Sequence, residues 1–100
     1  MNFYQTEKSG PLAKNIVQKV GQTVTYLNLK AGSETGWHDV PYSVIVVPFE
    51  GELIFQAEDE SQVIHPGHVV EMEPGERHNV IAKMDSGVIV VKSKLDKKVN

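Results

Sequence analysis

Turn-forming residues recur at short, fairly regular intervals along this chain, and this spacing restricts its fold more than any other feature. The signals fall at 31–33, 50–51, 58–61, 65–67, 73–76 and 85–87. The segments between them are rich in Val, Ile, Thr, Tyr and Phe, which strands favour. No segment joins a helical period to capping residues. The pattern predicts an all-β domain, a sandwich or a barrel of short antiparallel strands.

Alternating polarity marks two of the expected strands. Apolar side chains within 23–30 mostly fall two apart, and Val70-Glu71-Met72-Glu73 alternates apolar with acidic. A period of two with one wet face is typical of antiparallel strands at a surface. If the apolar pair of the second segment faces the core, its acidic pair faces solvent.

Two other segments, 44–47 and 88–91, are apolar throughout. We expect them to be buried on both faces, either inside a sandwich or beneath a partner subunit. Residues 12–17 could begin a short helix. Gly10-Pro11 before them and the β-branched residues among them favour an extended arm or a first strand instead.

Length and composition limit the domain organisation. The chain has 100 residues, of which 40% are hydrophobic, and this is enough for one core. We therefore expect a single domain over 1–100, with residues 1–12 as an extended N-terminal arm. The sequence has no cysteine, so no disulfide supports a small core, and a homodimer is one way to compensate.

Charge and hydropathy argue against several classes of partner. The N-terminal residues lack the pattern of a signal peptide, and no apolar run approaches the roughly 18 residues of a membrane helix. We expect no membrane partner and a cytoplasmic location. The formal net charge is −3 and no basic stripe is interleaved with aromatic residues, so we expect no nucleic-acid partner. The acidic run 58–60 is interpreted as a hairpin tip and the lysines of the tail as a solvated chain end. These lysines are Lys92, Lys94, Lys97 and Lys98.

A frame of glycines, one proline and two histidines carries a resemblance to a known family. Its members are Gly32, His38, Gly51, Gly67, Pro74, Gly75 and His78. Over about residues 22–92 this frame resembles the two sequence motifs of the cupin family, here of the small single-domain, cupin 2 type. Pro74 stands one place later than the motif proline, and Ala82 stands where the family often has Asn. The resemblance implies a double-stranded β-helix, or jelly-roll barrel, of antiparallel strands, and commonly a dimer.

The resemblance also implies a metal site inside the barrel, made by three histidines and a glutamate. His38 and His78 match two of these positions, whereas Val40 and Val44 stand at the other two. Two imidazoles alone make a weak and unselective site for Zn, Fe, Mn or Ni, since catalytic zinc sites have three protein ligands and many iron sites have two histidines and a carboxylate. We keep both readings open: a tentative metal site at His38 and His78, or two pocket histidines hydrogen-bonded to backbone, tyrosine or each other.

The valines would line the barrel interior with methyl groups, and this predicts an apolar ligand pocket. Its expected members are His38, Val40, Tyr42, Val44, Met72, His78 and Val80. Trp37 and Tyr42 either pack at the rim or form the mouth of the pocket. Asp39 should point to the opposite face from His38. His65 and His68 flank a Pro-Gly turn, so we expect both to face solvent.

Three functions follow as hypotheses. The first is a cupin-fold protein that binds a small molecule in the barrel pocket, as a binding or sensing module rather than an enzyme, because valines replace two ligand positions. The second is a metal-dependent enzyme of isomerase or dioxygenase type that uses His38 and His78. The third is a structural, dimerising β-domain.

Overall fold

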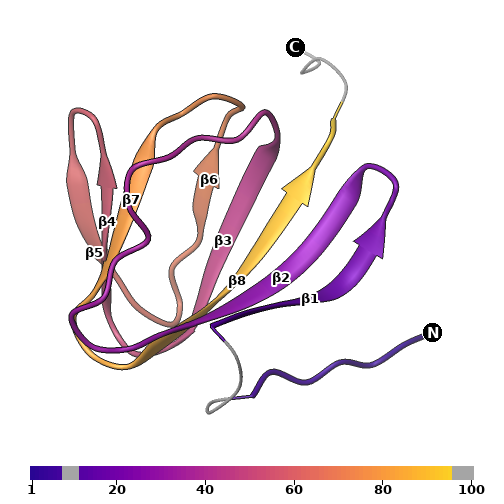
Figure 1. Ribbon diagram of the computed structural model, residues 1–100, viewed down its shortest axis with the longest axis horizontal. Coiled ribbons are helices and arrows are strands. Elements are labelled where there is room, and N and C mark those ends of the chain that lie inside the picture. The colour runs from indigo at the N-terminus through magenta and orange to yellow at the C-terminus, as the bar shows by residue number, and fades with distance from the viewer. Residues whose placement is uncertain (8–11, 96–100) are drawn as a thin grey trace.

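The computed structural model describes residues 1–7 and 12–95, and in them the chain forms two antiparallel sheets that face each other (Figure 1). The described residues contain no helix, which confirms the all-β prediction. The strands are β1 (Ala13–Lys19), β2 (Gln22–Leu29), β3 (Ser43–Glu50), β4 (Leu53–Ala57), β5 (Ser61–Ile64), β6 (Val70–Met72), β7 (His78–Ala82) and β8 (Ser86–Ser93).

The larger sheet has the order β1-β2-β8-β3-β6, and the smaller sheet has the order β5-β4-β7. Strands that are distant in the sequence therefore lie side by side, as β8 does between β2 and β3. The loop before β3 extends the smaller sheet, because it forms isolated bridges to β7 through Glu34 with Ile81 and His38 with His78. This docked segment, residues 31–40, brings the first predicted histidine beside the second.

The core lies between the inner faces of the two sheets, and both sheets supply it by alternate residues. Val44 and Val46 of β3 and Val88 and Val90 of β8 are buried there, together with residues of β2, β4, β5, β6 and β7. In β6, Met72 is buried and Glu71 is exposed, as the alternation predicted.

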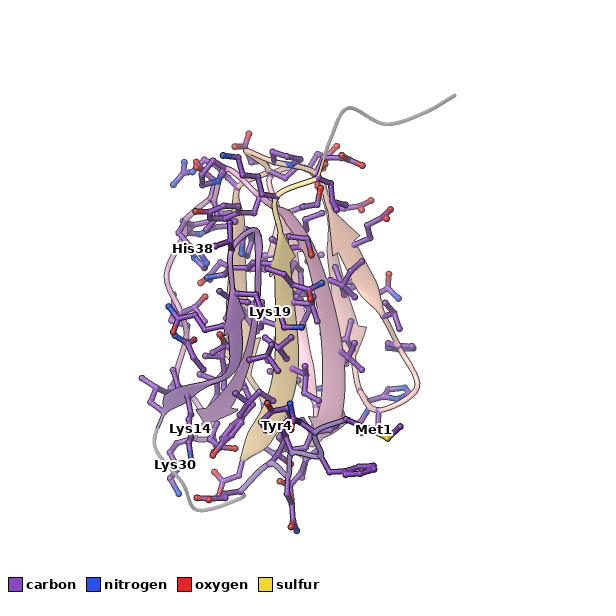
Figure 2. The ribbon with its side chains drawn as sticks, turned by 90° about the vertical axis from the view of Figure 1, so that its right-hand side faces the viewer. Met1, Tyr4, Lys14, Lys19, Lys30 and His38 are labelled. Atoms are coloured by element: carbon purple, nitrogen blue, oxygen red, sulfur yellow. The ribbon has the colours of Figure 1, made fainter. Side chains whose placement is uncertain are left out.

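The prediction that the two apolar runs are buried on both faces is wrong for the single chain. Their outward residues Ile45, Val47, Ile89 and Val91 are only half-buried. The reason is that the described residues form no third sheet over this outer face. The N-terminal segment contacts it through the Glu7 carbonyl and Asn28, and its residues Met1 and Tyr4 lie toward the lower end of the face in Figure 2. Burial beneath a partner subunit remains a prediction.

The turn between β3 and β4 needs a glycine. Gly51 has φ 81°, a conformation that side-chain-bearing residues rarely adopt. A Cβ at this position would collide with Ser86 Oγ and with the backbone of residues 85 and 86. The glycine that anchored the first motif therefore sits where the β3–β4 turn passes closely over the start of β8.

Residues near the N-terminus contain the predicted first strand, since β1 covers most of 12–17. Ahead of it, Asn28 Nδ2 donates a hydrogen bond to the Glu7 carbonyl oxygen at 2.6 Å. Residues 8–11 of the expected arm, and Lys97 and Lys98 of the tail, lie outside the described residues. No helix capable of crossing a membrane occurs in the part of the chain that the structure describes.

Candidate functional site

His38 and His78 form a pair at one end of the barrel. The His38 amide donates to the His78 carbonyl at 3.0 Å, and the His78 amide donates to the His38 carbonyl at 2.9 Å. This reciprocal bridge sets the two side chains next to each other, and their ring centroids lie 4.2 Å apart at an interplanar angle of 59°. In Figure 2, His38 lies in the upper half of the molecule, far from Lys30, which directly precedes the docked segment.

The Nδ1 atoms of both rings face backbone carbonyl oxygens. His38 Nδ1 lies 2.9 Å from the Gly36 oxygen, and His78 Nδ1 lies 3.0 Å from the Glu76 oxygen. A carbonyl oxygen only accepts, so each Nδ1 carries the proton and each neutral ring keeps its lone pair on Nε2. The pair therefore offers two acceptor nitrogens. Each ring is hydrogen-bonded to the backbone, an arrangement that fits both readings left open above.

His78 is the more enclosed of the two, with 7% of its surface exposed. Phe55 stacks on the ring at a centroid distance of 5.6 Å and an angle of 10°. Burial lowers the pKa of His78 below its ordinary value, against the opposing effect of its hydrogen bond to the Glu76 carbonyl. The neutral ring is favoured near pH 7, so its Nε2 lone pair is available to a ligand.

A cavity of about 90 Å³ lies between the sheets beneath the two histidines. Six of the seven predicted pocket residues line it: His38, Val40, Val44, Met72, His78 and Val80. Tyr42 does not, and 39% of its surface is exposed. It lies just before β3 begins, outside the alternating register that would have carried its ring inward.

Trp37 and Asp39 also lie at the surface. Trp37 is 43% exposed, and the Arg77 guanidinium lies 5.9 Å from the centre of its ring, a cation–π contact at the rim. Asp39 is exposed, as are its neighbours Trp37 and His38, so exposure does not separate the faces of Asp39 and His38. Neither Trp37 nor Asp39 lines the cavity.

The metal site that the resemblance implies does not fit the donors present. The described residues contain no group of three or more His, Cys, Asp or Glu side chains able to hold a metal ion. Val40 and Val44 line the cavity in place of ligands, while Glu71 and Glu73 are exposed. Two imidazole nitrogens fall short of the three protein ligands of a catalytic zinc site.

A wider groove of about 540 Å³ opens between the edge strands β5 and β6. Phe55, Met72 and His78 line both this groove and the inner cavity. The groove and the cavity therefore lie side by side, with these three residues between them. His68 lines it and is half-buried, so the expectation that this residue faces solvent is wrong, whereas His65 is exposed.

Sequence reasoning missed several residues that line the cavity, and Lys92 is the most informative of them. It was interpreted as part of a solvated tail, but it belongs to β8. Val88, Val90 and Lys92 fall two apart, and the first two are buried. Extending the period of two by one step would have placed Lys92 inward.

Comparison with solved structures identifies the fold. An RmlC-like cupin from Desulfovibrio desulfuricans matches with a TM-score of 0.82 and 20% identity, over 93% of this chain and 96% of that chain. A cupin superfamily protein from Desulfitobacterium hafniense matches with a TM-score of 0.79 and 11% identity, over 90% of this chain and 83% of that one. No family model matches the sequence, and no curated protein matches it.

These structures define the class: the chain has the cupin fold, as the motif resemblance predicted. Among the structures that share it is the DMSP lyase DddQ from Ruegeria pomeroyi, with a TM-score of 0.76 and 16% identity, over 87% of this chain and 48% of that one. At such identities the likeness concerns the fold, and a function has to be argued from this chain's own residues.

Proposed function

We propose that this protein binds a small molecule in the barrel cavity and acts as a binding or sensing module. The observation that carries the proposal is an apolar cavity lined by two histidines, with a wider groove beside it. Apolar walls with a few placed polar groups are typical of small-molecule sites. Valines at two ligand positions of the family motif favour binding over metal-dependent turnover.

The test is a fragment screen by two-dimensional NMR on the wild-type protein. Fragments should shift the amide signals of Val44, Met72 and Val80, which lie around the cavity. Val44→Leu adds a methylene group inside it, and the loss of space should weaken binding by about tenfold, equivalent to about 1.4 kcal/mol.

Val63→Leu is the matched control, because Val63 is 40% exposed on β5. It should bind fragments as the wild type does. Fragments that shift only surface amides, or that bind Val44→Leu and the wild type equally, would refute the cavity as the binding site. The spectra of both variants also report whether the fold is intact.

A metal-dependent enzyme is the second candidate, and the hydrogen bonds at Nδ1 favour it. Metal-ligating histidines usually donate the other ring N–H to a carbonyl or carboxylate, which orients the ring. Both His38 and His78 have this arrangement. A third donor would have to come from a substrate, from water or from outside the described residues.

Elemental analysis distinguishes the two candidates. The protein is purified without a tag and without chelators, beside His38→Ala. Under our proposal neither sample contains stoichiometric metal. Near-stoichiometric metal in the wild type that disappears in His38→Ala would support the enzyme instead. His65→Ala is the control, since it removes an exposed histidine away from the cavity.

A further inference from the structure

The inner face of β8 ends in a charged residue. Val88, Val90 and Lys92 occupy successive inward positions, and Lys92 stands opposite the buried Val44 in the register with β3. Its side chain is half-buried and lines the cavity. All other residues around the cavity are apolar, threonine or histidine. Lys92 is therefore the one residue around the cavity with a permanent charge, and that charge is positive.

The ammonium group of Lys92 has no ion pair or side-chain hydrogen bond among the described residues. Withdrawing an ammonium from water without a partner is costly, so a half-buried lysine either extends to solvent or meets an anion. Thr25, Val40 and the histidine pair line the same cavity, and no carboxylate is among its lining residues. An anionic group of a ligand would supply the missing partner.

The histidine pair accepts hydrogen bonds, whereas Lys92 only donates them. Both Nδ1 protons are donated to backbone carbonyls, so the Nε2 atoms accept. A ligand that satisfies the whole cavity therefore needs an anionic acceptor for Lys92 and a nearby hydrogen-bond donor for the histidines. A carboxylate with a neighbouring hydroxyl group has both.

We infer that the cavity takes the acid end of a short hydroxy acid, with the carboxylate on Lys92 and the hydroxyl donated to the histidine pair. The inference rests on the proposed binding function and names its class of ligand. The volume of about 90 Å³ equals the liquid volume of about three waters. Only the end of the ligand enters, and the remainder lies in the groove.

The charged residues around the groove disfavour a ligand that carries a second acid group. These residues are Asp59, Glu60, Glu71, Glu76 and Arg77, beside His68. Four carboxylates against one guanidinium give the groove a negative potential, which repels a second carboxylate outside the cavity. The preferred ligand is a monoacid whose outer part is neutral or cationic.

The test compares lactate with lactamide and propionate, by NMR titration near neutral pH. Lactamide lacks the charge, and propionate lacks the hydroxyl. We expect the wild type to bind lactate at least about tenfold more tightly than either analogue. Lys92→Met should bind lactate and lactamide equally, and Lys92→Arg should keep the preference for lactate. Lys94→Met, which changes an exposed lysine, should behave as the wild type.

Equal affinity for lactate and lactamide in the wild type would overturn the inference, as would an unchanged preference in Lys92→Met. Either result would mean that Lys92 simply extends to solvent. If the wild type binds propionate as tightly as lactate, the histidine pair does not recognise the hydroxyl group. That result would overturn the hydroxy-acid assignment. If neutral fragments shift the cavity amides and lactate does not, this inference fails while the proposed function stands. If nothing shifts them, the proposed function itself fails.

Discussion

The imidazole of His78 packs against the rings of His38 and Phe55 and lies largely out of water. This burial couples the stability of the protein to pH. Burial holds the pKa of His78 below the value of about 6.5 that it has in an unfolded chain. Between these two values the unfolded state binds more protons than the folded state. The free energy of unfolding therefore falls as pH falls. The contribution is complete above about pH 6.5 and is lost progressively down to the folded-state pKa.

Replacing the ring should remove this part of the acid sensitivity. We predict that the free energy of unfolding of His78→Gln depends less on pH below about 6.5 than that of the wild type. The measurement is urea unfolding at a series of pH values, with a chelator present so that metal binding plays no part. His65→Gln is the matched control, because it makes the same change in an exposed turn. Parallel curves for the wild type and His78→Gln would contradict the prediction.

At the scale of the strands, most strand positions and their inward faces could be predicted from the sequence. Turn residues and β-branched segments predicted the strands, and alternation correctly oriented Met72 and Glu71. The resemblance to the cupin motifs assigned His38 and His78 to one site, and the structure brings their rings together. Local periodicity worked because each strand presents one face to the core.

Predictions of burial from the sequence pattern were wrong at positions where the packing of other parts of the chain decides burial. Ile45 and Val91 continue apolar runs, but they face outward and are half-buried, because the described residues form no third sheet over that side. Tyr42 precedes the first residue of β3, so no register constrains it. Lys92 was missed because its charge suggested a tail, although its place in the alternation of β8 fixes it inward. The docked segment 31–40 has no strand signal, since only isolated bridges hold it to β7.

For the whole molecule, the outer face of the larger sheet points to self-association. Two rows of side chains cross β2, β8 and β3 in register. One row is Val24, Val91 and Ile45, and the other is Tyr26, Ile89 and Val47. All except the buried Tyr26 remain half-buried in the single chain. A contiguous apolar patch on one face of a sheet is typical of a protein interface.

We propose that two chains pair through this face, which would complete the burial predicted for the two apolar runs. Val91→Lys places a charge at the centre of one row, and an unpaired charge inside an apolar interface is costly. It should raise the dimer dissociation constant by at least about tenfold, or about 1.4 kcal/mol. Sedimentation velocity over a range of concentrations measures this. Val63→Lys, on the other sheet, should leave the association unchanged. A wild-type protein that stays monomeric at every concentration would refute the dimer.

The cavity, which lies on the inner side of the same sheet, should bind its ligand equally well in Val91→Lys, because the substitution points away from it.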